Sequence, residues 1–586
     1  MSNHKSLYEY AREHTPGIVL SGGCVLLFVA LNLLTPAILG RAVDALGGGR
    51  AAAGELVRQL VFFLSASAAG SMVSYFMRRI PLKIGHQVEY AIRRDLFAHL
   101  ARLEQGFYRE NRIGDLMTKM GSDVSTVRDF VGSGLLQGTR AAVVCVLAFA
   151  VMFATQPHLT LVLLPLFPTM ALTFFLCIGA IRRRYERVQE QYSEVTNFSQ
   201  ETFAGIRTVK GFALEERRRG AFGALNRELV RRNLRLAFIQ QPLWPVFAFW
   251  FALGLMLLLV VGGRRIIRGE MTLGELVQFQ GYLIFMQWPM LSIGWTASLI
   301  QRGRTSWGRI EEIFNRTPAI GDGPAEEADA VGRERPAPAA DIEFRGVGLH
   351  AGGRVLLDGL ELRIPRGATV GITGPTGSGK TLLVSLLPRV LDPDAGGVFV
   401  DGRDVRAYPL RALRALIGVA PQEPVLFSDT LEGNLGFGLE QPARETILWA
   451  SEVAHLHEDV AAFPLQYETL LGERGVTLSG GQRQRTAIGR ALARRPAILI
   501  LDDVLAAVDT QTEAEILRKL RPVMERCTTL LVSHRVSTLR RADFIVVLEN
   551  GRLTARGTHE ELLAQPGYYR ELNELQEIEQ VLEAEP

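Results

Sequence analysis

Long apolar stretches restrict the first half of this 586-residue chain more than any other feature of its sequence. A helix needs about twenty apolar residues to cross a bilayer. Five stretches approach or reach that length, at Ile18–Leu39, Leu56–Phe76, Ala141–Thr155 (extending back over Arg140), Leu159–Ile181 and Leu243–Val261. A sixth, Leu276–Ile300, is the least apolar. Because lipid offers the backbone no hydrogen-bond partner, each span is expected to be a helix.

The second half of the chain contains a glycine-rich motif of the phosphate-binding type. The motif reads Gly374-Pro375-Thr376-Gly377-Ser378-Gly379-Lys380-Thr381 and fits G-x-x-x-x-G-K-[ST]. It follows the strand-like stretch Ala368–Thr373 and precedes the helix-like stretch Leu382–Val390. Glycines let backbone N–H groups turn toward phosphates, and the following helix adds its positive end. We expect Lys380 to reach the β- and γ-phosphates and the Thr381 hydroxyl to bind Mg²⁺; a glycine-rich turn without function is the alternative.

Two further motifs follow about a hundred residues downstream. Leu478-Ser479-Gly480-Gly481-Gln482 precedes a second apolar run, Ile498–Leu501, which ends in Asp502 and Asp503. A buried strand that ends in a carboxylate is the Walker B arrangement, so Asp502 is predicted to help hold Mg²⁺.

With these motifs in this order, the chain resembles the ATP-binding cassette (ABC) family over essentially its whole length. The LSGGQ sequence at this distance from a P-loop is highly specific. The other marks of the family also resemble stretches of this chain, in order Gln422 (Q-loop), Glu473-Arg474-Gly475 (exporter-type X-loop), Asp509 (D-loop) and His534 (switch histidine). The resemblance implies ATP and Mg²⁺ as cofactors. It assigns phosphate binding to Gly374, Thr376, Gly377, Ser378, Gly379 and Lys380, and metal binding to Thr381, Gln422 and Asp502.

The resemblance also implies a pair of nucleotide domains. In the family, two domains stack head to tail, with ATP between the P-loop of one and the LSGGQ of the other. Ser479, Gly480, Gly481 and Gln482 would therefore serve the site of a partner. The expected catalytic residues of this chain's own site are Lys380, Asp503 and His534.

The family pattern supports counting the sixth stretch as a span. The expected fold class is a membrane all-α domain of six helices plus a cytoplasmic α/β P-loop nucleotide-binding domain. Long arginine-rich segments follow the second and fourth spans, and the positive-inside rule places them in the cytoplasm. Six spans then return the nucleotide domain to the same side. We expect a multi-pass protein of the bacterial inner membrane, with the nucleotide domain and both termini cytoplasmic.

The domain boundaries are expected at 1–316 for the transmembrane domain, 317–340 for a linker rich in Pro, Ala and Glu, and 341–586 for the nucleotide domain. Segments around Asn111–Met120 and Glu201–Lys210, with breaks at Gly114 and Gly205, would contain the coupling helices of the family; solvated connector helices are the alternative. Prolines predict kinks within spans, at Pro165, Pro168, Pro242, Pro245 and Pro289.

Polar and aromatic side chains on the fifth and sixth spans are candidates for a translocation path, because polar groups at membrane depth usually face the bundle interior. They are Gln240, Gln241, Gln278, Gln280, Gln287, Trp244, Trp288 and Trp295. Anchoring in the membrane interface is the alternative for the tryptophans. The net charge of +4 gives no indication of nucleic acid, and none is expected as a partner.

Two positions depart from the family pattern. Fully active members have Glu directly after the Walker B Asp, where it polarises the attacking water, whereas this chain has Asp503, one methylene shorter. A misplaced base can forfeit much of its usual contribution of about 10²–10⁴-fold; a harmless acidic exchange is the alternative. Where the family offers a Tyr to stack on adenine, this chain has Ala351, with His350 beside it as a candidate substitute.

This combination resembles one subunit of bacterial heterodimeric multidrug exporters. We therefore expect ATP-driven efflux of hydrophobic or amphipathic compounds, with membrane lipid and a hydrophobic small-molecule substrate as partners. The chain would pair with a second half-transporter, its own ATP site would be degenerate and slow, and its LSGGQ would serve the partner site. The alternatives are a slowly hydrolysing homodimer, a lipid flippase, and a regulatory or sensor membrane protein that binds ATP as a ligand.

Overall fold

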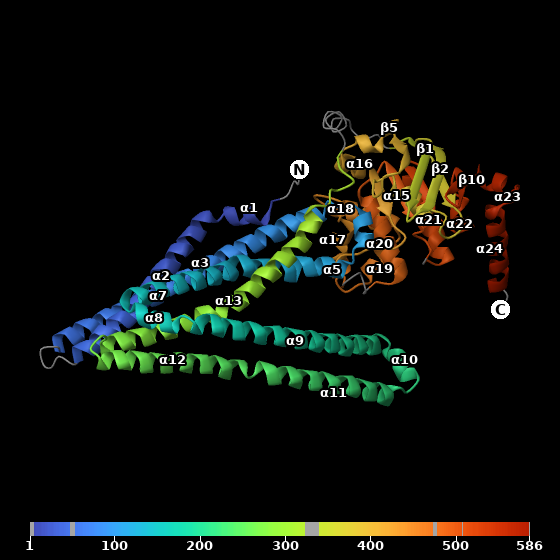
Figure 1. The fold of residues 1–586 in the computed structure, drawn as a ribbon. Coiled ribbons are helices and arrows are strands. Elements are labelled where there is room, and N and C mark those ends of the chain that lie inside the picture. Colours follow the sequence, from blue (N-terminus) through green and yellow to red (C-terminus); the bar gives the residue numbers. More distant parts are fainter. Residues whose placement is uncertain (1–4, 47–52, 323–338, 473–477, 507, 585–586) are drawn as a thin grey trace. The chain divides into compact units, whose positions relative to one another are not determined.

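The computed structural model describes residues 5–46, 53–322, 339–472, 478–506 and 508–584, and the chain divides into two compact units (Figure 1). The first consists of Met1–Ala101 and Ile113–Arg316, and the second of Arg102–Arg112 and Thr317–Pro586. The first unit is helical and the second is α/β, which confirms the predicted fold class. Of the expected linker, only 317–322 and 339–340 lie within the described residues. The expected X-loop residues Glu473-Arg474-Gly475 lie outside them.

Six helical stretches in the described residues are long and apolar enough to cross a membrane. They lie at Thr15–Leu46, Gly54–Leu100, Ile113–Thr155, Pro157–Ala204, Glu215–Ile267 and Leu273–Phe314. All six sequence-predicted spans fall inside them, including the least apolar one. Each helical stretch is longer than the span alone, because the polar flanking segments continue the same helices.

The helices before the nucleotide-binding part have the following bounds. They are α1 (Leu7–Arg12), α2 (Thr15–Leu46), α3 (Ala53–Leu100), α4 (Gln105–Glu110), α5 (Ile113–Thr118), α6 (Val124–Asp129), α7 (Leu135–Thr155), α8 (Pro157–Leu163), α9 (Leu166–Ala204), α10 (Ile206–Gly211), α11 (Glu215–Gln240), α12 (Leu243–Ile267) and α13 (Leu273–Phe314), with π-helical turns η2 (Lys119–Asp123) and η3 (Phe130–Gly134). Helices α9 and α11 lie side by side (Figure 1).

Helix breaks fall where the backbone loses its regular hydrogen bonds. Pro165 and Pro242 separate α8 from α9 and α11 from α12, as proline cannot donate to the preceding turn. Gly205 ends α9, as predicted. The predicted break at Gly114 is wrong, because Gly114 lies inside α5. The chain leaves the helix at Asn111 instead, whose backbone N–H and side-chain amide both donate to the carbonyl of Phe107, at 3.0 and 2.9 Å.

Helices α2 and α13 approach closely at a pair of glycines. A methyl group on Gly274 would overlap the carbonyl oxygen of Gly40 and the carboxylate of Asp44. The Asp44 carboxylate accepts hydrogen bonds from the backbone N–H of Gly274 at 2.7 Å and from the hydroxyl of Thr272 at 2.8 Å. This contact therefore depends on the absence of a side chain at Gly274, and it fixes the N-terminal end of α13 against α2.

The second unit contains two sheets. The smaller is antiparallel, in the order β2–β1–β4–β5, and the larger runs β10–β9–β3–β8–β7–β6. Its strands are parallel except for the β10–β9 pair. The strand bounds are β1 (Ile342–Ala351), β2 (Arg354–Ile364), β3 (Thr369–Thr373), β4 (Ala395–Val400), β5 (Arg403–Asp404), β6 (Ile417–Ala420), β7 (Ile498–Asp502), β8 (Thr528–Val532), β9 (Phe544–Glu549) and β10 (Arg552–Gly557).

Short helices connect these strands. They are α15 (Lys380–Ser385), α16 (Leu410–Leu416), α17 (Leu431–Leu435), α18 (Arg444–Val453), α19 (His457–Ala461), α20 (Gly480–Ala493), α21 (Thr510–Met524), α22 (Val536–Leu539), α23 (His559–Leu563) and α24 (Tyr568–Ala584), with 3₁₀ turns η4 (Val405–Ala407) and η5 (Gln466–Glu468). Strands β3, β7 and β8 are fully buried, and β7 is an apolar run that ends in a carboxylate. Parallel strands place their carboxyl ends at one edge, which brings the loops after β3, β7 and β8 together.

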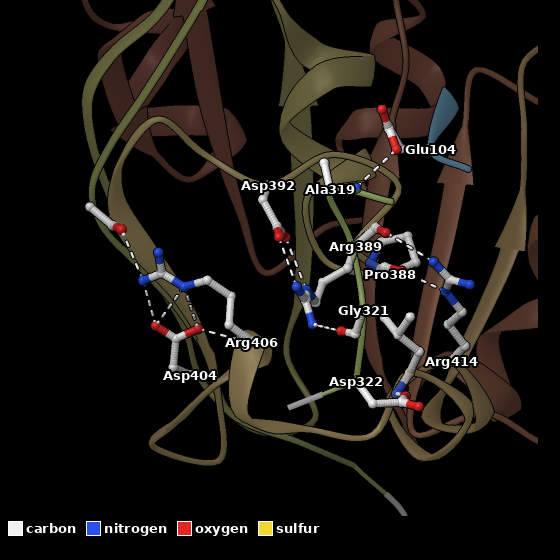
Figure 2. A network of polar contacts seen from close by, with 12 residues as sticks. Glu104, Ala319, Gly321, Asp322, Pro388, Arg389, Asp392, Asp404, Arg406 and Arg414 are labelled. Carbon is white, nitrogen blue, oxygen red and sulfur yellow. Dashed lines mark hydrogen bonds and ion pairs between the residues drawn. The ribbon is translucent and has the colours of Figure 1, made fainter. Parts of the chain in front are cut away.

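An arginine anchors the stretch after α15. Arg389, only 5% exposed, donates to both carboxylate oxygens of Asp392 at 2.9 and 2.7 Å and to the carbonyl of Gly321 at 2.9 Å (Figure 2). Arg414 in turn donates to the carbonyls of Pro388 and Arg389, each at 3.0 Å. The chain segment that enters the nucleotide-binding part is thus bound to the end of the P-loop helix.

The same entering segment has two further polar contacts (Figure 2). The backbone N–H of Ala319 donates to the Glu104 carboxylate at 3.1 Å, and Asp322 accepts from the backbone N–H of Leu410 at 2.9 Å. Glu104 belongs to the short segment Arg102–Arg112, which packs with the second unit. This segment follows the second span, so residues distant in sequence meet on one surface of the unit.

Candidate active site

The P-loop has the close backbone approach that its glycines permit. Gly374 follows strand β3 with φ +145°, and a methyl group there would overlap the carbonyl oxygen of Leu548. Gly379 has φ +103°, and its Cβ would lie 2.9 Å from the Cδ2 of Leu357. Only glycine combines these dihedral angles with this proximity. The loop can therefore curl between β3 and α15 and direct N–H groups inward.

Two side chains of the loop are suited to phosphate. Lys380, the first residue of α15, is buried, and its Nζ donates to the carbonyls of Gly374 at 2.8 Å and Pro375 at 2.9 Å. Burial lowers the pKa of Lys380, and the negative charges of Asp503 and Asp502 oppose that shift. The Ser378 hydroxyl is also buried and has no hydrogen-bond partner in the described protein. An orphaned hydroxyl inside a glycine-built cradle fits a ligand oxygen.

Strand β7 delivers a buried carboxylate beside the P-loop helix. Asp502, 4% exposed, accepts a hydrogen bond from the side chain of Thr381. Burial raises the pKa of Asp502; the Thr381 hydrogen bond and the Lys380 charge oppose this shift, and the Asp503 charge adds to it. A hydroxyl and a carboxylate side by side are oxygen donors of the kind that Mg²⁺ prefers. The residues present therefore fit a magnesium ion.

The acidic residue after β7 lies at the centre of a second group of contacts. Asp503 has a left-handed backbone, φ +49°, and its N–H donates to the carbonyl of Val532 at 2.9 Å. Its carboxylate accepts from the side-chain amide of Gln422 at 3.4 Å and from the backbone N–H of His534. The structure thus brings together Gln422, Asp503 and His534 from the loops after β6, β7 and β8.

Burial shifts both titratable groups of this trio toward their neutral forms. It raises the pKa of Asp503, which the positive charges of His534, Lys380 and Arg535 oppose. It lowers the pKa of His534; Lys380 adds to the lowering and Asp503 opposes it. An imidazole and a carboxyl group whose pKa values are shifted in these directions are suited to hydrogen-bond a ligand and to exchange a proton with it.

The LSGGQ and D-loop residues lie apart from this cluster and form helix caps. Ser479 and Gln482 make a reciprocal capping box at the start of α20, with distances of 3.2 and 3.0 Å. Asp509 caps α21 by accepting from the N–H of Thr512 at 2.9 Å. Within the described residues, no hydrogen bond or ion pair joins these caps to the P-loop. The N-terminus of α20 therefore presents Gly480 and Gly481 to another molecule or to solvent.

The candidate adenine-contacting residues lie at the end of β1. The backbone N–H of His350 donates to Asp394 at 2.6 Å, and its ring Nδ1 lies 3.4 Å from the same carboxylate. More than half of the His350 side chain is exposed, and Ala351 is exposed beside it. The exposed ring is available for contact, although its observed partner is Asp394.

Sequence reasoning missed Gln576 on the C-terminal helix α24. Its side-chain amide donates to the carbonyl of His534 at 2.6 Å and accepts from the N–H of Val536 at 2.9 Å. The switch segment is thereby held between β8 and α22 by a residue some forty positions later. The C-terminal sequence indicates only an acidic amphipathic helix, and no local signal marks Gln576 as a neighbour of the switch.

Comparison with known proteins gives two family matches. Residues 18–290 match the ABC transporter transmembrane region, and residues 357–506 match the ABC transporter family. The chain is 31% identical over 567 residues to the multidrug resistance-like ATP-binding protein MdlA of Escherichia coli (strain K12), covering 96% of this chain and 94% of MdlA. It is 30% identical over 578 residues to the ATP-dependent lipid A-core flippase of Syntrophus aciditrophicus (strain SB), covering 98% and 95%.

The chain belongs to the ABC transporter family. Among solved structures it is similar to a bacterial Atm1-family ABC exporter with ATP bound, with a TM-score of 0.80, 26% identity, and coverage of 96% of this chain and 99% of that one. As an ABC exporter, it binds ATP and couples ATP hydrolysis to transport. It is also a multi-pass membrane protein.

Proposed function

We propose that this ABC exporter chain is one half of an efflux transporter for hydrophobic or amphipathic compounds, that it pairs with a second, catalytically complete half-transporter, and that its own ATP site turns over slowly. The observation that carries the proposal is Asp503, which lies among Gln422, His534 and Lys380 but ends one methylene short of the Glu found in fully active members. The P-loop, Asp502 and the LSGGQ sequence otherwise match the family pattern.

The residues of the own site have distinct tasks in this proposal. The P-loop amides with Thr376, Ser378 and Lys380 hold the phosphates, and Lys380 moves from the loop carbonyls to the terminal phosphate. Thr381, Asp502 and Gln422 would hold Mg²⁺, which neutralises phosphate charge when bound. Asp503 would orient the water and accept its proton.

His534 contacts the γ-phosphate from the switch, and Gln576 fixes the backbone of His534. Ser479, Gly480, Gly481 and Gln482 would touch the nucleotide bound by the partner, with Asp509 at the same interface. In the part of the chain that the structure describes, no hydrogen bond or ion pair joins these caps to the P-loop, which supports a role toward another molecule. This arrangement leaves one site able to hydrolyse rapidly, that of the partner.

The proposed setting is the bacterial inner membrane, with the nucleotide domain and both termini in the cytoplasm. The arginine-rich segments after the second and fourth spans support this orientation. The division into 1–316, 317–340 and 341–586 stays a prediction, with 102–112 as a loop that packs with the nucleotide-binding part.

Co-purification and transport together test the proposal. The tagged full-length chain should capture a second half-transporter with Glu after its Walker B Asp, and inverted vesicles containing both should accumulate a fluorescent hydrophobic compound when ATP is added. Lys380→Ala should reduce ATPase less than the matching change in the partner. A stable dimer of this chain alone with brisk ATPase would contradict the pairing, and ATP binding without any transport would favour a sensor.

A lipid flippase is the second candidate, because one relative at 30% identity is named for that activity. Movement of a fluorescent phospholipid between the leaflets of proteoliposomes, dependent on ATP, would favour it over export of soluble compounds.

A further inference from the structure

Three helices of the membrane-spanning unit surround a cavity of about 430 Å³. This volume lies within the range of small-molecule sites, roughly 300–1,000 Å³. The lining includes Arg78 of α3, Gln137 and Arg140 of α7, and Trp288, Ser292 and Trp295 of α13. The residues from α7 and those from α13 recur at helical spacing, so each helix contributes one face. Apolar ring surface and cationic groups therefore share one space.

Neither arginine of the cavity has an acidic partner in the part of the chain that the structure describes. No Asp or Glu lines the cavity, and within the described residues neither Arg78 nor Arg140 forms an ion pair. The Nε of Arg140 is buried without a hydrogen-bond partner, and its guanidinium lies 5.0 Å from the ring centre of Phe28. By contrast Arg79, the next residue after Arg78, donates to the hydroxyl of Tyr75 at 2.7 Å.

Unpaired cations at this place in the chain are costly unless a ligand supplies the opposite charge. Arg78 follows the apolar stretch that ends at Phe76, and Arg140 precedes the one that begins at Ala141. Ionisable side chains in such segments usually pair with each other or serve a transported ligand. Two guanidinium groups beside one cavity cannot neutralise each other, and arginine is well suited to bind the oxygens of phosphate or carboxylate.

We propose that this cavity binds the acidic group of an amphipathic substrate, a phosphate, sulfate or carboxylate, through Arg140 and Arg78, with the apolar part of the substrate against Trp288 and Trp295. This proposal rests on the proposed export function and names its substrate class, which is anionic amphiphiles. Without the arginines, the rings of Trp288 and Trp295 would equally accept cationic or neutral compounds. Phe28 and the burial of the Arg140 Nε pre-orient one guanidinium, which lowers the entropy lost on binding.

Binding without ATP tests the site independently of transport. The purified full-length transporter, with its partner subunit where one co-purifies, is placed in phosphatidylcholine nanodiscs, and quenching of tryptophan fluorescence is measured with dodecyl phosphate and with dodecyltrimethylammonium. Empty nanodiscs correct for partitioning. We expect dodecyl phosphate to bind more tightly, and Arg140→Gln or Arg78→Gln to weaken it by about tenfold or more while leaving the cation unaffected, because charge-assisted hydrogen bonds are lost.

Arg79→Gln is the matched control and should leave both affinities unchanged, and Arg140→Lys should retain part of the preference for the anion. Equal affinity of the wild-type protein for the two probes would overturn the proposal, and this result needs no variant to fold. Unchanged binding of dodecyl phosphate in both arginine variants would overturn it as well, provided that they elute and bind ATP like the wild type.

A second arm distinguishes the source of the acidic group. Phosphatidate in the nanodisc should compete with dodecyl phosphate if the natural ligand is a membrane lipid, and should not compete if it is a free amphiphile; both results support an anion site. Charge-selective binding without ATP-dependent transport would refute the proposed function and leave the site intact. Transport without any charge preference would refute the site and leave the proposed function intact.

Discussion

Replacing Asp503 with Glu lengthens the side chain of the proposed water-orienting residue by one C–C bond, about 1.5 Å. A misplacement of about 1 Å can reduce a catalysed rate by about 10²-fold. The whole contribution of a general base is about 10²–10⁴-fold, which sets the upper limit. We therefore expect Asp503→Glu to raise hydrolysis at this chain's own site by about ten- to a hundred-fold.

The backbone conformation at residue 503 is expected to make the Asp503→Glu variant less stable than the wild type. Asp503 has φ +49°, a left-handed conformation that Asp tolerates better than longer side chains do. A cost of about 1 kcal/mol corresponds to a decrease in Tm of about 2–4 °C for a domain of this size. The variant should thus be faster and slightly less stable, a combination that a general improvement of folding would not produce.

The assay must isolate one site. The transporter is prepared with the catalytic carboxylate of the partner subunit neutralised, and phosphate release is followed in a single turnover. Asp503→Asn is the control, since it keeps the shape and removes the charge, and it should lower the residual rate. The residual rate of the wild-type site should also fall as pH is lowered, because burial raises the pKa of Asp503 and a protonated carboxyl cannot accept a proton.

Two outcomes would refute this reasoning. One is an Asp503→Glu variant that is no faster than the wild type in the single turnover. This result would mean that the length of the side chain at residue 503 does not limit the rate of hydrolysis. The other is loss of all ATPase activity in Asp503→Ala with an intact partner, because a degenerate site should contribute little to the total.

The contacts outside the P-loop lead to three further expectations. Gln576→Leu removes two hydrogen bonds to the switch backbone, together about 1–3 kcal/mol. With the catalytic carboxylate of the partner neutralised, it should lower the single-turnover rate at this chain's own site about tenfold, whereas Asn573→Leu on the same helix should leave that rate unchanged. Arg389→Ala leaves a carboxylate without its partner and should lower the Tm measured by thermal unfolding, by an amount equivalent to about 2–3 kcal/mol. Gly274→Ala should reduce the yield of folded protein in size-exclusion chromatography, whereas Gly263→Ala, with nothing within 4 Å of its added methyl, should not.

The sequence alone was sufficient to predict those features that depend on a short, continuous stretch of residues. A long apolar run needs only its own length to indicate a membrane helix, which is why five of the spans could be located from the residues alone. The sixth and least apolar one was counted partly because of the family resemblance. The P-loop could be placed between a strand and a helix because its glycines and flanking apolar runs lie within one short segment. The meeting of Gln422, Asp503 and His534 could be predicted only through the family resemblance, since these residues come from three separate loops.

Contacts between distant segments could not be predicted from the sequence. Gln576 is an ordinary polar residue of an acidic helix until packing brings it to the switch. The sequence does not distinguish Arg78 and Arg140 from the many other arginines near the ends of the spans. Only the tertiary arrangement shows that these two share a cavity. The break at Asn111 in place of Gly114 has a different, local origin, because Asn111 ends its helix through a hydrogen bond to Phe107, only four residues earlier.

The capping box of α20 separates the structural from the functional part of the LSGGQ sequence. Ser479 and Gln482 satisfy each other's backbone groups, so helix stability alone is a reason for both. Gly480 and Gly481 occupy the first two positions of α20. Glycine is a poorer helix former than alanine, by about 1 kcal/mol in a helix interior, so the capping box does not explain the two glycines. Gly481→Ala should therefore leave the Tm unchanged or raise it, yet abolish ATP hydrolysis at the partner's site if this surface approaches a nucleotide closely. Unchanged ATPase in the Gly481→Ala variant would mean that the LSGGQ sequence serves only to start its own helix.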